Sequence, residues 1–424
     1  MDEQFIQFLW KFGLFDKQDM RTTTGESIEV LSLGVHNTDA GPDFSNARLK
    51  IGNVVWAGNV EVHRSASDWN RHCHQCNEAY NNVILHVVQH NDCTIQSHNG
   101  ASVAVYEIQY DTRFEQRYLQ LMNDKKDVPC QHILPQIEHF HWQSFLTRLA
   151  CERLEQRAQH IADLLATNKN DWEATFLQLL FRAFGFGINA DPLEQLAQSI
   201  SPACIAKHKN SLLQLEALLF GQAGFLDELP HDEYQHKLQQ EYNLLKIKFL
   251  LAPLPKHVWK FLRIRPVNFP TVRIAQLASL LHSTQSLFTQ SIAATTLADA
   301  LKLFAADTSE YWHTHYSFDT VSPDRSKPLG KKSAERLVAN VLIPTMFHYG
   351  QVRNDEQLCN RAISLLEQLP PEENAKTAIW ERLQLPPGNM LESQALLQLT
   401  NEYCNKHQCL RCVVGRQVIS DFRC

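Results

Sequence analysis

The sequence predicts an α+β protein, with an N-terminal mixed α/β-sheet domain over residues 1–125 and a large all-helical domain over residues 126–424. Two patterns indicate this class. Hydrophobic residues recur at every second position in five N-terminal segments, residues 28–33, 47–51, 60–63, 82–88 and 102–108, as in half-buried strands. After residue 112 the period lengthens to that of amphipathic helices, and strands disappear from the pattern.

In chain order, residues 5–12 are predicted to form an amphipathic helix whose aromatic face caps the domain core. Among the strands that follow, residues 47–51 and 60–63 are predicted to form a hairpin around Gly52-Asn53. A polar connection, residues 64–80, leads to the next strand. A charged run ending at Pro129 marks the boundary between the domains, and prolines separate the helical segments beyond it.

The composition is that of a globular protein of two or more domains, with 44% hydrophobic residues in 424. Its 40 basic and 46 acidic residues are interspersed and give a net charge of -6, so any anion site must be local. The N-terminus is acidic where a secretory signal is basic, and no run of about eighteen apolar residues exists. We therefore expect a cytoplasmic protein without a membrane segment, whose eleven cysteines are mostly reduced.

Two acids and an imidazole lie close together in the predicted sheet. Asp43 stands at the entrance of one strand, and Glu61 and His63 leave the same face of its neighbour. Two carboxylates around a divalent cation such as Mg²⁺ or Mn²⁺ can polarise a phosphoryl oxygen and prepare a water nucleophile. In the alternative, Asp43 caps a turn and His63 is a satisfied surface residue. Glu61 then forms an ion pair with Arg48 or Arg64.

Three further histidines stand near this group in the sequence. His72 and His74 lie in the polar connection, and His86 lies in the next strand. If they converge with Glu61 and His63, the site is rich in imidazole and suits a transition metal. Two loop imidazoles two residues apart reach the same side only in an extended conformation, which this connection permits. In the alternative, His86 is a core histidine bonded to a backbone carbonyl.

The C-terminal segment offers thiolate ligands at Cys404, Cys409 and Cys412, with Cys424 at the last position. The CxxC spacing of Cys409 and Cys412 is typical of a metal knuckle, and Cys424 or His407 can complete four ligands for a structural zinc. In the alternative, reduced thiols simply pack the end of a helix.

One irregular stretch, residues 260–273, combines four cations with two phenylalanines. Its arginines Arg263, Arg265 and Arg273 are local candidates for contact with phosphate or a single-stranded nucleic acid. Arginine also binds carboxylates, so ties to buried glutamates are the alternative explanation.

The segment from Pro42-Asp43 to Glu61-Val62 resembles the PD-(D/E)xK nuclease superfamily, in which a Pro-Asp pair is followed by an acidic residue, any residue and lysine on a strand. The resemblance implies an α/β nuclease core that holds a divalent cation. Some of these nucleases also carry an iron-sulfur cluster on cysteines of different spacing. His63 occupies the place of the lysine, so a fixed positive charge is replaced by a ligand or a base.

Over nearly its whole length the chain is similar to an uncharacterised bacterial family, domain of unknown function 2851, found chiefly in Bacteroidetes. The likeness rests on GPDF at 41–44, GNVEVH at 58–63, SDW at 67–69, YNNVILHVV at 80–88, EALLFGQAGFL at 216–226, RIRPVNFPTVRIAQLA at 263–278, ESQALLQLTNEYC at 392–404 and CLRC at 409–412. The family loop that corresponds to residues 71–77 carries an acid, and this chain keeps His72 and His74 there but lacks the acid.

These observations predict a metal-dependent phosphodiesterase or nuclease-like hydrolase that uses Asp43, Glu61 and His63, with nucleic acid as a partner. A thiol nucleophile at Cys73 or Cys76 is a minor enzymatic alternative. The alternative of another class is a non-catalytic scaffold or partner-binding protein that holds a structural zinc.

Overall fold

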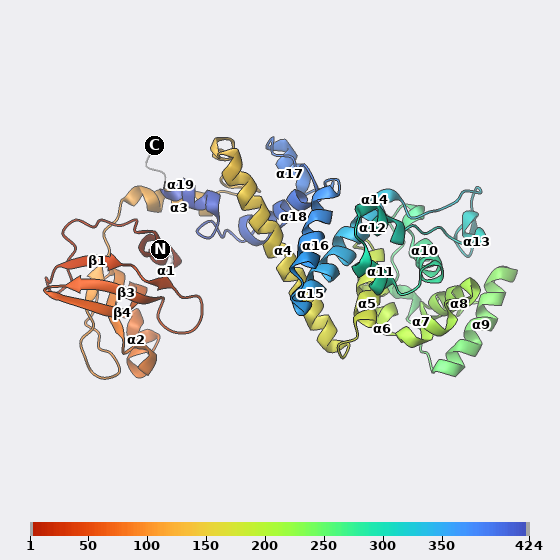
Figure 1. Cartoon of the computed structure of the whole chain (residues 1–424), viewed down its shortest axis with the longest axis horizontal. Coiled ribbons are helices and arrows are strands. Elements are labelled where there is room, and N and C mark those ends of the chain that lie inside the picture. Colours follow the sequence, from red (N-terminus) through yellow and green to blue (C-terminus); the bar gives the residue numbers. More distant parts are fainter. Residues whose placement is uncertain (1–2, 421–424) are drawn as a thin grey trace. The chain divides into compact units, whose positions relative to one another are not determined.

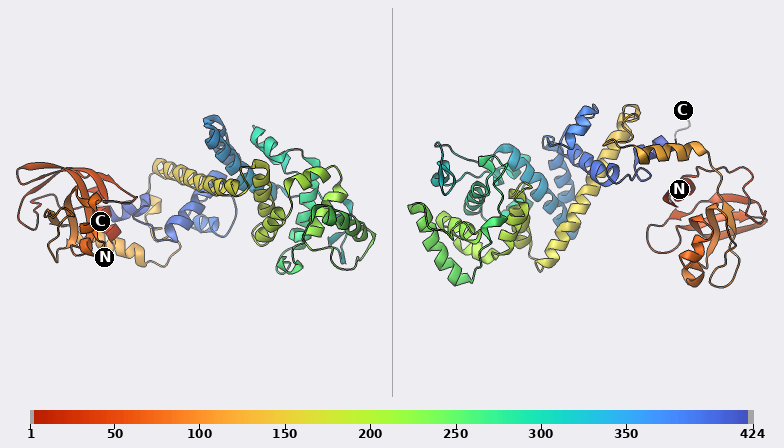
Figure 2. Two further views of the ribbon diagram at one scale, coloured as in Figure 1. Left: turned by 90° about the horizontal axis from the view of Figure 1, so that it is seen from below. Right: turned by 180° about the vertical axis from the view of Figure 1, so that it is seen from behind.

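The computed structural model describes residues 3–420 and divides into two compact units (Figures 1 and 2). Unit 1 comprises residues 1–142 together with 399–424, and unit 2 comprises residues 143–398. A mixed sheet lies in the N-terminal part and many helices follow, which confirms the predicted α+β class.

The sheet of unit 1 contains β1 (Ile28–Ser32), β2 (Val35–His36), β3 (Phe44–Ile51), β4 (Val54–Ser65), β5 (Val83–His90) and β6 (Val105–Glu107). The strand order is β1-β3-β4-β5-β6, with β2 beside β3. β3 is antiparallel to β1, β2 and β4, whereas β4, β5 and β6 are parallel. The predicted hairpin is present between β3 and β4, where Ile51 pairs with Val54 and Gly52 takes a φ of +58° that the turn requires.

Helix α1 (Glu3–Phe12) packs on β4, as its aromatic pattern indicates. Its buried residues are Phe5, Ile6, Phe8, Leu9 and Trp10, and the Trp10 indole N–H donates to the carbonyl of Leu33 over 3.1 Å. The polar residues of the same helix lie beside the edge of the sheet at which Asp43 stands, because Gln7 donates to the Asp43 carboxylate. The helix thus closes the core and also brings polar groups to that edge.

Unit 1 also contains the last described part of the chain. Helix α3 (Thr112–Asn123) packs against α19 (Val413–Ser420), where Arg117 Nη1 donates to the carbonyl of Ile419 over 3.4 Å. A π-helical turn, Leu399–Cys404, precedes this return. The Arg416 guanidinium lies 4.9 Å from the ring of Phe12 in α1. The observed division therefore differs from a boundary at residue 125, because the C-terminal segment buries its apolar face within the N-terminal unit.

Unit 2 is helical. Helix α4 (His139–Thr167) runs across the division, and the helices that follow it are α5 (Trp172–Phe184), α6 (Ala190–Gln198), α7 (Pro202–His208), α8 (Leu212–Gln222), α9 (Glu233–Phe249), α10 (Pro270–Ser283), α11 (Leu287–Ala293), α12 (Leu297–Leu303), α13 (Glu310–His313), α14 (Lys331–Leu337), α15 (Ile343–Arg353), α16 (Glu356–Gln368), α17 (Thr377–Arg382) and α18 (Met390–Gln398). A two-stranded hairpin, β7 (His315–Ser317) and β8 (Thr320–Val321), interrupts them. These strands are too short to show a period of two in the sequence.

Helices α8 and α10 form the centre of unit 2. Every residue from 215 to 222 and from 271 to 278 is buried, so these helices are enclosed on all sides. Gly221 of α8 permits a close approach to α9, because a Cβ atom at this position would lie 2.1 Å from Cγ of Tyr242. The absence of a side chain here lets the two helices pack.

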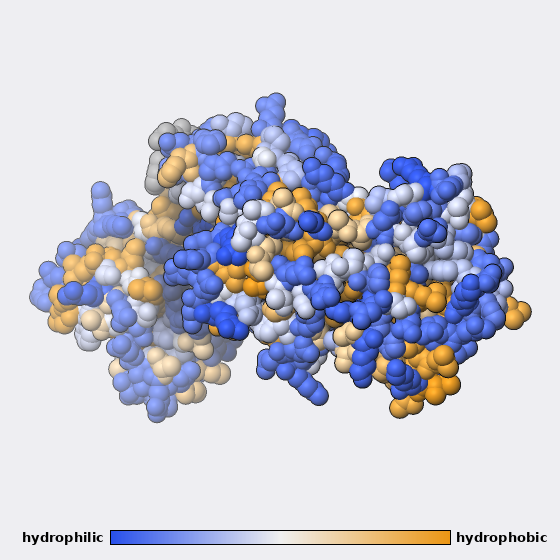
Figure 3. All heavy atoms as spheres, turned by 45° about the vertical axis from the view of Figure 1, so that its right-hand side comes forward, coloured by the Kyte–Doolittle hydropathy of each residue, from blue (hydrophilic) through white to orange (hydrophobic). Residues whose placement is uncertain are grey.

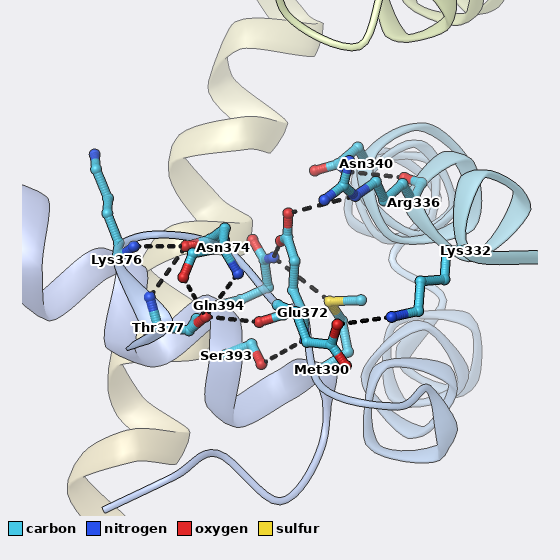
Figure 4. A network of polar contacts seen from close by, with 11 residues as sticks. Lys332, Arg336, Asn340, Glu372, Asn374, Lys376, Thr377, Met390, Ser393 and Gln394 are labelled. Carbon is cyan, nitrogen blue, oxygen red and sulfur yellow. Dashed lines mark hydrogen bonds and ion pairs between the residues drawn. The ribbon is translucent and has the colours of Figure 1, made fainter. Parts of the chain in front are cut away.

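The connection between α16 and α17 is held by a polar network (Figure 4). Glu372 accepts a hydrogen bond from Gln394 Nε2 over 3.1 Å, and its other oxygen lies 3.9 Å from Arg336 Nε. The backbone N–H of Glu372 donates to Ser393 Oγ over 2.9 Å. One carboxylate thereby links this connection to both α14 and α18.

The surface agrees with the interspersed charges of the sequence. Figure 3 shows hydrophilic residues around smaller hydrophobic areas on the visible face. Within residues 3–420, no helix combines the length and the apolar character that crossing a bilayer requires.

A candidate metal centre in unit 1

Asp43 and Glu61 meet at the entrance of β3. The register between β3 and β4 pairs Phe44 with Val60, which places the residues next to them side by side. The backbone N–H of Asp43 donates to Glu61 Oε2 over 3.0 Å, and the N–H of Val62 donates to Asp43 Oδ2 over 2.9 Å. The Glu61 carboxylate is therefore held by the backbone of Asp43, and the Asp43 carboxylate by the backbone of Val62.

Helix α1 adds two residues that the sequence interpretation missed. Gln7 Nε2 donates to Asp43 Oδ1 over 2.9 Å. Glu3, one turn earlier, is half-buried and interacts electrostatically with Asp43, Glu61 and His72. The spacing of four residues places Glu3 and Gln7 on one helix face, which was the available signal.

The histidines converge on Glu61. His74 Nε2 lies 3.2 Å and His63 Nε2 lies 3.5 Å from Glu61 Oε1. His72 Nδ1 lies 3.1 Å from His63 Nε2. One nitrogen each from His63, His72 and His74 lies within 4.8 Å of the others. His86 stands behind them, with its Nε2 2.8 Å from His63 Nδ1.

The loop that carries His72 and His74 is not extended, so an extended conformation is not needed to bring the two imidazoles to the same side. Helix α2 (Asp68–Arg71) and a 3₁₀ turn (His74–Cys76) flank Cys73, which takes the left-handed conformation at φ 60° and ψ 29°. This reversal turns both imidazoles toward β4. The loop is anchored by the indole of Trp69, which donates to the carbonyl of Gln96 over 2.9 Å. His74 also stacks on the Tyr80 ring with a centroid separation of 3.8 Å.

Burial sets the protonation of the site. It is the main cause that raises the pKa of both Asp43 and Glu61 to about 7, and the charge of Glu61 adds to the effect on Asp43. Burial likewise lowers the pKa of His63 to about 2 and that of His86 to about 3, helped by the neighbouring imidazoles. It also lowers the pKa of His74. Near neutral pH the imidazoles of His63, His74 and His86 are therefore neutral, and the acid pair readily releases a proton.

Three observations argue against a purely structural cluster. Among residues 3–420, neither Asp43 nor Glu61 forms an ion pair with an arginine or a lysine, so the alternative pairing of Glu61 with Arg48 or Arg64 is not present. His63 is only 1% exposed and is not a surface residue. The buried His74 Nε2 has no hydrogen-bond partner, because its approach to Glu61 lacks the required direction. Buried nitrogens without a partner are costly unless a ligand occupies them.

The remaining predicted site residues lie elsewhere. Cys404, Cys409 and Cys412 lie in the C-terminal return of unit 1, and Cys424 lies outside the described residues. In unit 2, the side chains of Arg263 and Arg265 are exposed.

Arg273 is buried in unit 2. Its Nη2 donates to Asn268 over 2.6 Å, its Nη1 donates to Gln276 over 2.8 Å, and its guanidinium lies over the ring of Phe186 at 4.4 Å. Neutral amides and a ring hold this guanidinium, and the glutamate of the alternative explanation is not among its hydrogen-bond partners in the described part of the chain.

Fold and site together define an α+β protein with a buried carboxylate and histidine centre in its sheet domain. The chain belongs to the family described as "Protein of unknown function (DUF2851)", which it matches over residues 3–375. No curated protein and no solved structure matches it. The likeness to the PD-(D/E)xK nucleases stays a prediction.

Proposed function

We propose that unit 1 is a metal-dependent hydrolase of phosphodiesters, with its cation bound by Glu61, His63, His72 and His74. The observation that supports this most directly is the convergence of three imidazole nitrogens, with the Glu61 carboxylate beside those of His63 and His74. Ligand atoms about 2.0–2.1 Å from a tetrahedral ion lie about 3.4 Å from one another. Three of the six separations among these atoms, at 3.1, 3.2 and 3.5 Å, agree with this value.

The ligand types favour a particular class of ion. Magnesium prefers six oxygen ligands and retains its water, imidazole suits Zn²⁺ and related transition metals, and Mn²⁺ suits the carboxylate and water ligands of such a site. His86 and Asp43 complete the site as residues that orient the ligands. His86 fixes the ring of His63, and Asp43 fixes the backbone of Val62 between the two strand ligands. We therefore expect Mn²⁺ or Zn²⁺ in preference to Mg²⁺.

A substrate can reach the centre from the side that faces solvent. His72 is exposed, whereas Glu61, His63 and His74 are buried, so the approach is from the side of His72. When bound there, the ion polarises a phosphoryl oxygen and lowers the pKa of a coordinated water. Glu3 is the group to accept the proton of the attacking water, because burial and then the charge of Asp43 raise the pKa of Glu3 to about 7.

Arg71 supplies the positive charge that the missing lysine would carry. Its side chain is 70% exposed, lies 2.6 Å from the Asp68 carboxylate and acts electrostatically on His63. A guanidinium held in this way contacts a phosphate oxygen and leaves the metal ligands undisturbed.

Hydrolysis by metal-reconstituted protein tests the proposal. The metal-stripped chain is loaded with Mn²⁺, Zn²⁺ or Mg²⁺ and assayed on bis(p-nitrophenyl) phosphate and on single- and double-stranded DNA. We expect Mn²⁺- or Zn²⁺-dependent cleavage that is lost in Glu61→Gln and His63→Ala. It should persist in His90→Ala, which changes an exposed histidine of β5.

A non-catalytic protein with a structural zinc is the second candidate, since four protein ligands can also close a structural site. Stoichiometric Zn²⁺ whose removal unfolds unit 1, without cleavage of any of these substrates, would establish it and refute the hydrolase.

A further inference from the structure

A buried arginine lines a small cavity in unit 2. Arg273 of α10 is 6% exposed, and its Nη atoms donate to the side-chain oxygens of Asn268 and Gln276. Its buried Nε has no hydrogen-bond partner, and no aspartate or glutamate among residues 3–420 forms an ion pair with it. Burial lowers the pKa of Arg273 to about 10, so the guanidinium stays charged at neutral pH. A buried cation of this kind is costly unless an anion compensates it.

The composition of this cavity suits an anion. Its volume is about 170 Å³, and none of the described residues that line it is acidic. Beside Arg273, its wall includes Arg336, Asn268 and Ser333. Ser333 and Arg336 stand three residues apart in α14 and therefore lie on one face of that helix. Two guanidinium groups, an amide and a hydroxyl thus border a space without a carboxylate.

Contacts within unit 2 hold the wall of the cavity in place. Asn189 Nδ2 donates to the carbonyl of Lys260, and Asn189 Oδ1 accepts from the N–H of Lys260, both over 2.9 Å. This pair joins the start of α6 to the segment before α10. Phe186 places its ring 4.4 Å from the Arg273 guanidinium. The guanidinium is therefore fixed by a ring and two amides before a ligand binds, which lowers the entropy lost on binding.

A larger cavity shares two wall residues with the small one. Phe186 and Arg336 line both, and the larger cavity has a volume of about 450 Å³. Part of its wall is apolar and includes Ile161, Leu179 and Pro344. Figure 4 shows Arg336 facing Glu372, whose carboxylate lies 3.9 Å from Arg336 Nε. This separation is too long for a hydrogen bond, so the guanidinium can still donate to an oxyanion.

Arg157 of α4 adds a cation to the larger cavity. Its Nη1 donates to the carbonyl of Ala339 over 3.3 Å, and no carboxylate of the described residues forms an ion pair with it. Arg182, in the same wall, is neutralised by ion pairs with Asp191 and Glu194. The larger cavity therefore combines an apolar wall with positive charge.

We propose that the small cavity binds the phosphate group of an organic phosphate and that the larger cavity accommodates the organic part. A phosphate monoester brings about two negative charges and three acceptor oxygens, which match two guanidinium groups and the neutral donors beside them. A carboxylate brings one charge and would leave the second guanidinium uncompensated. Of the three arginines predicted to contact phosphate, Arg273 lines this cavity. The site shares no residue with the histidine centre and does not depend on the proposed hydrolysis.

Calorimetric titration of the metal-stripped, full-length protein tests the site. The probes are inorganic phosphate, phenyl phosphate and benzoate, and removal of metal excludes phosphate that binds to a cation in unit 1. We expect phenyl phosphate to bind about tenfold more tightly than inorganic phosphate, because its ring enters the apolar cavity, and about tenfold more tightly than benzoate. An affinity for either of the other probes that equals the affinity for phenyl phosphate would overturn the proposal.

Variants assign the binding to particular side chains. Arg273→Gln and Arg336→Gln should each weaken phenyl phosphate binding about tenfold, and the control Arg265→Gln, at an exposed arginine of the same segment, should bind as the wild type does. Ala183→Leu enlarges a wall residue of the larger cavity and should weaken the binding of phenyl phosphate but not of inorganic phosphate. Arg71→Ala should retain binding, so that failure of the hydrolase is distinguished from failure of this site. Unchanged affinity in Arg273→Gln or Arg336→Gln would overturn the proposal.

Modification of the wild-type protein with phenylglyoxal provides a test that does not depend on the folding of variants. The reagent modifies accessible arginines, and peptide mass spectrometry measures the extent with and without saturating phenyl phosphate. We expect the ligand to reduce modification of Arg336 about fivefold, because a bound phosphate covers its guanidinium. Modification of the exposed Arg263 and Arg265 should not change. Equal modification of Arg336 in both conditions would overturn the proposal.

Discussion

Replacing Glu61 by glutamine should stabilise the metal-free protein while removing its ability to bind a cation. Glu61 is 4% exposed, and its pKa is raised from 4.5 to about 7, mainly by burial. Glutamine keeps an oxygen for the N–H of Asp43. Its amide can donate to His74 Nε2, which now lacks a hydrogen-bond partner. The variant therefore removes a costly buried charge and satisfies an imidazole nitrogen.

The size of the effect follows from the pKa of Glu61. A rise from 4.5 to about 7 corresponds to about 3 kcal/mol, at about 1.4 kcal/mol for each pH unit. Asp43 carries part of the unfavourable free energy of burying this acid pair. We therefore expect Glu61→Gln to increase the free energy of unfolding by about 1–3 kcal/mol. The folded-state pKa lies above the unfolded one, so the stability of the wild type is lost as the pH rises from about 4.5 through 7. The advantage of the variant should thus be small at pH 4.5 and complete at pH 8.

Urea unfolding of metal-stripped protein at pH 5 and pH 8 measures this difference, and calorimetric titration with Mn²⁺ measures the loss of binding. The histidines are present in both proteins, so their titration largely cancels. Glu29→Gln, at an exposed acid of β1, is the control and should change stability by less than about 0.5 kcal/mol at either pH. A variant that is less stable than the wild type at pH 8, or that binds Mn²⁺ with unchanged affinity, would refute the reasoning.

Three further changes separate the roles of individual residues. His86→Phe removes the partner of His63 Nδ1 and should weaken Mn²⁺ binding about 10- to 100-fold in a chelator competition. The control His90→Ala should bind Mn²⁺ as the wild type does. Arg71→Ala should lower kcat/KM for the phosphodiester about tenfold and leave Mn²⁺ affinity intact; an equal loss of both would argue against phosphate contact. Gly221→Val forces a side chain against Tyr242 and should destabilise unit 2 by about 3 kcal/mol in urea unfolding, with metal content unchanged.

The strands and the acid pair were predictable because they depend on local patterns. Alternation identifies strands, Gly52-Asn53 identifies the hairpin, and the spacing from Asp43 to Glu61 follows from pairing across that hairpin. The predicted convergence of His63 with Glu61 needs only the period of a strand.

The remaining parts of the site depend on packing between distant segments. Glu3 and Gln7 reach the acids only because α1 docks on β4, and no local pattern gives that docking. The left-handed conformation of Cys73, rare for a residue with a side chain, cannot be read from a polar loop.

The division of unit 1 between the two ends of the chain has a consequence for synthesis. Its sheet and α3 leave the ribosome first, but α19, which covers α3, is made only after the whole of unit 2. Until then the part of α3 that contacts α19 is uncovered, and a fragment that stops at residue 142 lacks α19 altogether. The sheet domain therefore reaches its final form only after unit 2 has been translated.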